Sequence, residues 1–221
     1  MESHIVKVLA TEYLTHNVKR FVTEKPAGYN YTPGQATDMS INIPGLETEL
    51  RPFTFTSPVN ADYLEFIIKI YKGHDGITEQ LADVIPGDEL IIHEVFGAIE
   101  YKGPGIFIAG GAGITPFIAI FRQLHATGVS PHNALLFANH TSSDIILKDE
   151  LTGILRNRYI DVIRKPLPGE PQNVLDKQLI ASYKDGQVAY YYICGPDQFT
   201  ADMTHILHEL NIADQYIVFE H

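Results

Sequence analysis

Hydrophobic and polar residues alternate along six short runs in the first half of the chain, a pattern that predicts β-strands with one buried face. The runs are HIVKVLA, VKRFVTE, ATDMSINIP, RPFTFTS, LEFIIKIY and DELIIHEVF, and turns containing Pro or Gly separate them. Short strands at this spacing are typical of a small antiparallel β-barrel or sandwich. Within this half, GITEQLADV at residues 76–84 is the one short helical candidate.

The pattern changes after Gly103. The apolar runs GIFIAGG, ALLFANH, YIDVIRK, AYYYICG and QYIVFE are interspersed with the helical runs TPFIAIFRQLHAT, LKDELTGILR and PDQFTADMTHILHELN. Apolar strands that alternate with helices predict a parallel sheet covered on both faces. Because YKGPG has linker composition, we expect two domains: an antiparallel β-barrel at residues 1–102 and an α/β parallel-sheet domain at residues 103–221.

Composition narrows the classes of function. Hydrophobic residues are 45% and charged residues 19% of the chain, which fits a folded protein. A formal charge of −11 opposes binding to nucleic acid, which needs a surplus of Lys and Arg. No apolar run approaches ~18 residues and no signal peptide is evident, so we expect a cytoplasmic protein with no membrane span.

Metal sites and cross-links find little support in the sequence. Cys194 is the only cysteine, which excludes an intramolecular disulfide and a cysteine-ligated zinc or iron–sulfur site. His205, His208 and Glu209 share a helical face, but no second cluster accompanies them, and a solvated helix face explains them better. We expect a monomer without a metal.

The most specific stretch is GIFIAGGAGITPFIAIF. An apolar strand ends in Gly110, Gly111 and Gly113, and a helix begins near Thr115 with Pro116 in its first turn. Glycines let the backbone approach a ligand closely, and a helix N-terminus presents free N–H groups to an anion. The pattern favours a dinucleotide pyrophosphate, although GGAG departs from the common GxGxxG spacing. A glycine turn that only packs strand against helix is the alternative.

A second motif lies between another apolar strand and helix. YYYICGPDQFTADM places Cys194, Gly195 and Pro196 at the carboxyl end of a strand, on the rim where the glycine loop should lie. A buried structural cysteine is the alternative for Cys194. Two loops on one rim make a shared site the stronger interpretation.

Five segments, taken in order, resemble the ferredoxin–NADP reductase superfamily. They are PGQ at residues 33–35, RPFTFTS at 51–57, GIT at 76–78, GGAGITP at 110–116 and CGPDQF at 194–199. The resemblance implies an antiparallel β-barrel that binds FAD, followed by an α/β parallel-sheet domain that binds a nicotinamide nucleotide. The compact bacterial flavodoxin or ferredoxin reductases are the most similar subgroup.

The resemblance assigns roles along RPFTFTS, the strand that lies beside the flavin in this family. Arg51 matches a position that contacts the FAD pyrophosphate, a task suited to a planar, permanently charged group. Pro52 and Phe53 follow on the flavin side, and Phe53 lacks the hydroxyl of the tyrosine that many relatives carry. Thr54 matches a hydroxyl residue near the flavin N5.

Further flavin contacts are implied nearby. Gly76, Ile77 and Thr78 resemble the turn at a helix start that holds the same pyrophosphate. Ile68 and Ile70 lie on a strand expected to line the flavin, although core packing explains them equally well.

The C-terminus departs from the family. Many members end with an aromatic residue stacked on the flavin, whereas this chain ends YIVFEH. Glu220 matches a family glutamate near the active site, and Phe219 or His221 could take the place of the aromatic. A solvated terminus is the alternative. With Thr54 and Cys194, Glu220 completes the expected catalytic set.

The choice of nicotinamide cofactor rests on polar residues after the second and third strands of the α/β domain. Four of them could bind a 2′-phosphate: Ser142, Ser143, Arg164 and Lys165. This pattern favours NADPH, while Asp144 and Asp161 leave NADH possible as the cofactor. For the four candidates of the 2′-phosphate site, the alternative is that they only make the surface soluble.

The sequence therefore predicts an NAD(P)H-dependent flavoprotein reductase that passes hydride from nicotinamide to FAD and then single electrons to a flavodoxin or ferredoxin carrier. A flavin reductase that releases its flavin, an electron-transfer subunit of a larger oxidoreductase and a sensor without turnover remain alternatives. Acidic carriers would be repelled by a charge of −11 unless a basic patch attracts them. Five cations of the barrel half, with Arg51, are candidates for that patch: Lys19, Arg20, Lys25, Lys69 and Lys72.

Overall fold

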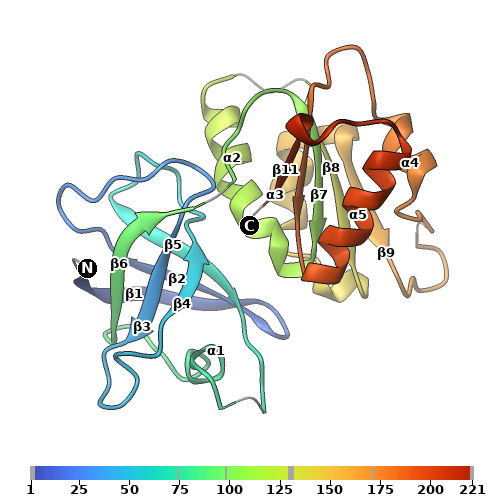
Figure 1. Cartoon of the computed structure of the whole chain (residues 1–221). Helices are drawn as coiled ribbons and strands as arrows, with labels where there is room; N and C mark the ends of the chain where they lie inside the picture. Colours follow the sequence, from blue (N-terminus) through green and yellow to red (C-terminus); the bar gives the residue numbers. More distant parts are fainter. Residues whose placement is uncertain (1–2, 74, 98, 129–131, 171, 220–221) are drawn as a thin grey trace.

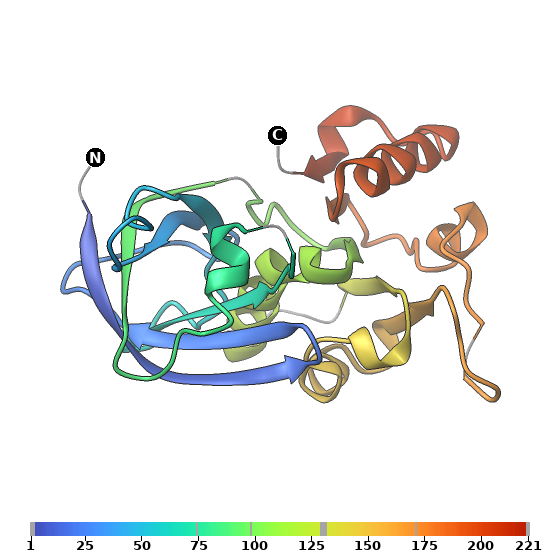
Figure 2. The ribbon, with the colours of Figure 1, turned by 90° about the horizontal axis from the view of Figure 1, so that it is seen from below.

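Two domains, each built on one β-sheet, lie side by side in the computed structural model (Figures 1 and 2). The structure describes residues 3–73, 75–97, 99–128, 132–170 and 172–219. The last strand of the first sheet ends at Phe96 and the first strand of the second begins at Gly105. Among the helices of the described ranges, none has the length and apolar character needed to cross a membrane.

The first domain is the predicted antiparallel barrel. Its strands are β1 (His4–Thr15), β2 (Val18–Glu24), β3 (Ala36–Ile41), β4 (Arg51–Thr54), β5 (Tyr63–Lys69) and β6 (Glu89–Phe96). They pair antiparallel in the order β4-β3-β6-β1-β2-β5, and a bridge between Phe55 and Phe66 joins the two edges. Closure removes the free strand edges, which would otherwise be open to pairing with other chains.

Aromatic side chains fill the end of the barrel near β4. Phe55 is fully buried and stacks on Tyr31 with ring centroids 4.2 Å apart. The Tyr31 hydroxyl shares a 2.7 Å hydrogen bond with the Ser57 hydroxyl and donates to the Ser57 carbonyl. Burial raises the Tyr31 pKa to about 12, so the phenol stays neutral as a donor at ordinary pH. The strand that carries the RPFTFTS motif is therefore anchored at its carboxyl end.

The helix expected at residues 76–84 is shorter than predicted. Helix α1 spans only Ile77–Gln80 and turns follow it. Lys19 is 3% exposed, and its Nζ donates to the carbonyls of Ala82 at 2.8 Å and Val84 at 2.7 Å. These carbonyls bond the ammonium group of β2 rather than the amides of a continuing helix. A buried lysine thus ends the helical turn.

The second domain is a parallel sheet covered on both faces, as predicted. Its strands are β7 (Gly105–Gly110), β8 (Ala134–Asn139), β9 (Tyr159–Ile163), β10 (Tyr190–Cys194) and β11 (Ile217–Phe219), in the order β11-β10-β7-β8-β9. Its α-helices are α2 (Thr115–Ala126), α3 (Lys148–Leu155), α4 (Lys177–Ser182) and α5 (Asp197–Glu209). One core holds α2 and α3 together with Val18 and Ile67 of the barrel. The other lies under α4 and α5.

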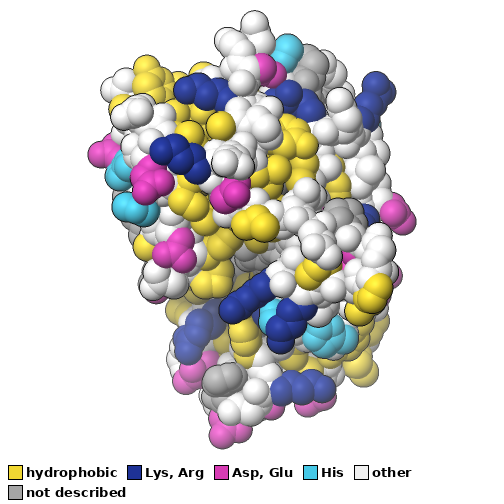
Figure 3. Space-filling view, turned by 90° about the vertical axis from the view of Figure 1, so that its right-hand side faces the viewer, with side chains coloured by type: hydrophobic (Ala, Val, Ile, Leu, Met, Phe, Trp, Pro, Cys, Tyr) yellow, Lys and Arg dark blue, Asp and Glu magenta, His cyan; other side chains and the backbone are white. Residues whose placement is uncertain are grey.

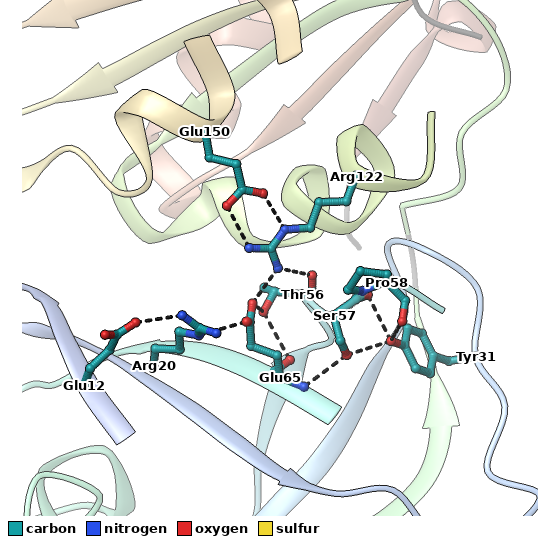
Figure 4. Close-up of polar contacts among 9 residues, drawn as sticks. All are labelled: Glu12, Arg20, Tyr31, Thr56, Ser57, Pro58, Glu65, Arg122 and Glu150. Carbon is teal, nitrogen blue, oxygen red and sulfur yellow. Dashed lines mark hydrogen bonds and ion pairs between the residues drawn. The ribbon is translucent and has the colours of Figure 1, made fainter. Parts of the chain in front are cut away.

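One ion-pair network joins the two domains (Figure 4). Glu65 on β5 is 1% exposed, and its carboxylate accepts a 2.5 Å hydrogen bond from Arg122 on α2. Arg122 also donates to the Thr56 carbonyl at 2.7 Å and to both carboxylate oxygens of Glu150 on α3, at 2.6 and 2.9 Å. Arg20 on β2 forms an ion pair at 2.8 Å with the other Glu65 oxygen. We call these five residues the interdomain network.

Pairing compensates the burial of charge in this network. Burial alone would lower the Arg122 pKa, but hydrogen bonding to Glu150 and the negative charge of Glu65 outweigh it, and the pKa is raised. The Thr56 hydroxyl donates to the Glu65 carboxylate at 2.7 Å, adding a neutral donor. With every charge paired, removal of one member leaves another buried charge with too few partners.

We expect Arg122→Met to lower the free energy of unfolding by about 3 kcal/mol, because it breaks a buried ion pair on one side and leaves the Glu65 carboxylate with Arg20 as its remaining charged partner in the network. Urea denaturation measures the change. The control is Glu12→Gln, since Glu12 is 55% exposed and pairs with Arg20 at 2.7 Å. This variant should lose less than about 1 kcal/mol. Equal losses in the two variants would contradict the assigned role of Arg122.

Candidate functional site

Two loops at the carboxyl ends of neighbouring strands β7 and β10 touch each other. A Cβ atom at Gly113 would lie 2.3 Å from the carbonyl oxygen of Cys194, so only glycine permits this approach. The Phe199 ring lies against both loops, 3.1 Å from where a Cβ of Gly110 would be and 2.5 Å from that of Gly195. The structure thus brings together the two motifs that the sequence placed on one rim.

A cleft of about 610 Å³ opens at this rim, between the two domains. Six residues of the two predicted nucleotide loops line it: Gly110, Gly111, Gly113, Cys194, Gly195 and Pro196. Gly111 has φ +54° and open space where a Cβ would stand, so its backbone is accessible from the cleft. Thr115 and Pro116 do not line the cleft, because a short 3₁₀ helix at Gly111–Ile114 precedes α2 and Pro116 is buried.

The barrel supplies the opposite wall of the cleft. Asn17 and Val18, at the turn between β1 and β2, line it together with Lys69 and Tyr71 at the end of β5. The Lys69 ammonium lies 5.2 Å from the centre of the Tyr71 ring, a cation–π distance. These four residues were not predicted, because only the docking of the two domains brings them to the rim.

The cleft contains charges of both signs. Asp144 and Arg164 line it, whereas Ser142, Ser143 and Lys165 do not. Burial would raise the Asp144 pKa, but hydrogen bonds from the Thr141 hydroxyl and amide lower it, so this carboxylate is ionised at neutral pH.

Both aspartates that had kept NADH open make other contacts. His16 of the barrel lies 3.7 Å from Asp144, across the two domains. Asp161 lies outside the cleft lining, where Lys148 pairs with it at 2.6 Å and the Tyr159 hydroxyl donates to it at 2.6 Å. Of the two, only Asp144 therefore faces the nucleotide rim.

The strand predicted to lie beside a flavin has an accessible face. Arg51 and Pro52 are exposed, and Phe53 and Thr54 are half-buried. The Arg51 guanidinium donates to the Leu50 carbonyl at 2.7 Å, and no ion pair with a described carboxylate compensates its charge. An accessible cation on the strand that also carries Phe53 and Thr54 suits an anionic flavin nucleotide.

Other residues predicted at the flavin have mixed positions. Ile68 is 2% and Ile70 is 3% exposed, and both belong to the barrel core. Their positions agree with core packing, the other explanation that the sequence offered for them. Gly76 precedes α1, Ile77 is buried, and Thr78 is half-buried in the first turn. Ile68, Ile70 and Ile77 therefore contribute to the core under the strand rather than to its surface.

A second cavity of about 760 Å³ borders the first through Cys194. Phe219 lines it, with Thr200, Thr204, His205 and His208 of α5 among the others. Phe219, at the end of β11, pairs in register with Ile193, so an aromatic side chain does stand near Cys194. Glu220, the third expected catalytic residue, lies outside the described residues.

The side chains near α5 do not gather around a metal. His208 contacts Asp214 at 2.6 Å and His205 contacts Glu209 at 3.5 Å, as separate pairs. Over the described ranges, no group of three or more His, Cys, Asp or Glu side chains is placed to hold a metal ion.

Three of the six cations that could form a basic patch have internal partners in the described part of the chain. Lys19 is buried, Arg20 belongs to the interdomain network, and Lys25 donates to the carbonyls of Val59 and Ala61 at 2.9 and 3.2 Å. These three cations are therefore poor candidates for a patch, and the sequence did not indicate this because the internal partners lie far away in it. On the face shown in Figure 3, Lys, Arg and His side chains are interspersed with acidic and hydrophobic ones.

Comparisons with known proteins agree with this arrangement. Residues 3–101 match the family model of an FAD-binding domain, and residues 107–205 match that of an oxidoreductase NAD-binding domain. The chain is 30% identical over 191 residues to human NADH-cytochrome b5 reductase 1, covering 72% of this chain and 62% of that protein. It is 28% identical over 201 residues to the reductase component of propane 2-monooxygenase from Rhodococcus jostii, covering 80% of this chain and 51% of that one.

Among solved structures, a ferredoxin NADP+ reductase from Neisseria gonorrhoeae with bound FAD and NADP superposes with a TM-score of 0.84. The match covers 100% of this chain and 98% of that one at 17% identity, a likeness of fold.

The chain belongs to the ferredoxin–NADP reductase superfamily, as the sequence motifs indicated. It carries the FAD-binding and the NAD(P)-binding domain of these oxidoreductases. It spans about half to three-fifths of the length of the curated relatives that it matches.

We expect Gly113→Ala to destabilise the protein by about 1–3 kcal/mol and to weaken NAD+ binding, because the added methyl must push the two loops apart. Thermal unfolding and calorimetric titration with NAD+ measure the two effects. Gly153→Ala on α3 is the control, since open space surrounds Gly153, and this variant should be as stable as the wild type or up to about 1 kcal/mol more stable. Unchanged NAD+ affinity in Gly113→Ala would show that the contact of the two loops does not shape the nucleotide site.

Proposed function

We propose that this protein is an NADH-dependent flavoprotein reductase that delivers electrons to a separate carrier protein. The observation that carries the proposal is the cleft whose walls come from both domains. The glycine loop and the Cys194 turn form one wall, and Lys69 and Tyr71 of the barrel form the other. A site shared by a flavin domain and a nicotinamide domain suits chemistry between the two cofactors.

The residues of this chain would bind and orient the cofactors. Arg51 would pair with the flavin pyrophosphate, and Phe53 would cover part of the ring system. Thr54 would place a hydroxyl beside the reacting part of the flavin, and Cys194 would border the nicotinamide end of the cleft. When both are bound, nicotinamide and flavin supply hydride transfer, and the protein supplies distance, orientation and exclusion of water.

The donor we propose is NADH, not the NADPH that the sequence favoured. Of the four residues expected to bind a 2′-phosphate, only Arg164 lines the cleft, and the ionised Asp144 lines it too. A carboxylate repels a phosphate and accepts hydrogen bonds from a ribose hydroxyl. Relatives named NADH-cytochrome b5 reductase support the same choice.

For the acceptor we propose a one-electron carrier of flavodoxin or ferredoxin type. A second candidate is an oxygenase component, because relatives are named as reductase components of propane 2-monooxygenase and this chain spans only about half of their length. Oxidation of the reduced protein by each kind of carrier would separate the two candidates.

Anaerobic mixing of the FAD-loaded protein with NADH should bleach the flavin absorbance with a second-order rate constant about tenfold or more above that for NADPH, equivalent to about 1.4 kcal/mol. Asp144→Asn should narrow that ratio, because it removes the repulsion of a 2′-phosphate. Ser143→Ala is the control and should leave the ratio unchanged, since Ser143 lies outside the cleft lining. If neither nucleotide bleaches the flavin, the reductase proposal fails; faster bleaching by NADPH overturns only the choice of donor.

Thr54→Ala should slow bleaching by NADH about fivefold while the flavin stays bound through gel filtration, because one hydrogen bond near the reacting atoms is worth about 1 kcal/mol. Thr54→Ser keeps the hydroxyl and should retain most of the rate. Equal rates for the alanine and serine variants would remove the Thr54 hydroxyl from the mechanism.

A further inference from the structure

Asn139 has a buried side chain amide without a hydrogen-bond partner in the described part of the chain. The residue ends β8 and is 7% exposed. Its Oδ1 and its Nδ2 both lack a hydrogen-bond partner among the described residues. Its backbone is paired normally, since the Arg164 amide donates to the Asn139 carbonyl at 2.9 Å. The unmet hydrogen-bonding capacity is therefore confined to the side chain.

Such atoms are few in the described ranges, and only those of Asn139 lie on the cleft. The others are the Arg20 Nε, which lies 2.8 Å from Glu65, and the two ring nitrogens of His93 on the barrel strand β6. A buried amide left unsatisfied costs free energy that a leucine of similar size would avoid. A ligand that supplies both a donor and an acceptor would remove that cost.

The position of Asn139 identifies which half of the nucleotide it would meet. Side chains alternate along β8, and Leu135 and Phe137 face the core beneath α2, so Asn139 continues that face at the rim. In the sheet, β8 lies on one side of β7 and β10, which carries Cys194, lies on the other. Asn139 is thus on the side away from the nicotinamide end, beside Asp144 and Arg164.

We propose that Asn139 binds the adenosine ribose of the nicotinamide nucleotide through its vicinal hydroxyls and helps to select NADH. This inference rests on the proposed function and adds a specificity residue to it. A diol both donates and accepts, so it satisfies Oδ1 and Nδ2 together. Phosphate oxygens only accept at neutral pH, so a pyrophosphate leaves Oδ1 without a donor, and a 2′-phosphate removes one of the two ribose hydroxyls that could donate to it. The amide therefore complements a free ribose.

The chain offers a matched control in Asn133. This asparagine is 1% exposed, accepts from the Gly105 amide at 2.9 Å and donates to the Tyr101 hydroxyl at 3.3 Å. Asn133→Leu removes a satisfied structural amide, whereas Asn139→Leu removes an unsatisfied one. Asn133→Leu should lower the thermal midpoint and leave ligand affinity unchanged. Asn139→Leu should keep or raise the thermal midpoint and weaken ligand binding.

The test measures thermal unfolding without nucleotide and calorimetric titration of the FAD-loaded protein with ADP-ribose and with 2′-phospho-ADP-ribose. Asn139→Leu should keep or raise the thermal midpoint, weaken ADP-ribose binding about tenfold or more, and shrink the preference for ADP-ribose over its 2′-phosphate form. Asn139→Asp keeps the acceptors for a diol and adds charge. It should hold ADP-ribose within about threefold and weaken 2′-phospho-ADP-ribose further.

Two results would overturn the inference. If Asn139→Leu lowers the thermal midpoint as Asn133→Leu does and leaves affinity intact, Asn139 is structural. If Asn139→Asp weakens ADP-ribose as strongly as Asn139→Leu, the amide binds phosphate rather than ribose. Failure of the proposed function is distinguishable, because the wild-type protein would then bind neither ligand and its flavin would not be bleached by NADH.

Discussion

The arrangement of the molecule depends on a single buried carboxylate. Glu65 stands on a barrel strand, is 1% exposed, and is held by guanidinium groups from both domains. The Arg122 that binds it sits on α2, the helix that follows the glycine loop, and also holds the carbonyl of Thr56, two residues beyond Thr54. One helix and one guanidinium thereby connect the nucleotide rim to the flavin strand. Since the cleft has one wall from each domain, this connection helps to hold its shape, together with the core that Val18 and Ile67 share with α2 and α3.

Close backbone contact sets the geometry of the rim itself. The room that Gly113, Gly110 and Gly195 leave is occupied by the Cys194 carbonyl and the Phe199 ring, so the glycines serve the packing of two loops as well as access to a ligand. The two interpretations offered by the sequence are therefore compatible. Gly111, with open space around it, is the glycine whose role is not explained by packing.

The fold was predictable because its signals are local in the sequence. The polar network was unpredictable, since its members lie far apart in the sequence. Alternation and apolar runs predicted both sheets and the three longest helices, and motif order predicted the two loops of the rim. Glu65 lies within LEFIIKIY as one polar residue of a strand, and nothing nearby indicates Arg122, 57 positions further on. The same holds for Lys19. Its place in an alternating strand sequence does not indicate that its ammonium group binds carbonyls just after α1. Asn17, Lys69 and Tyr71 reach the cleft only through domain docking.

Several Lys and Arg side chains are bound inside the protein, which affects how a chain with a net charge of −11 would attract or repel a partner protein. Lys19, Arg20 and Lys25 are bound within the barrel, so an acidic carrier would meet a surface less positive than composition suggests. Of the remaining candidates, Lys69 lines the nucleotide cleft. A carrier that relied on Lys69 would then compete with the nucleotide for the same charge. Arg51 is assigned to the flavin pyrophosphate, so Lys72 is the candidate cation left for docking. Apolar contact is the other means of docking, and long-range repulsion opposes it less at physiological salt than at low salt.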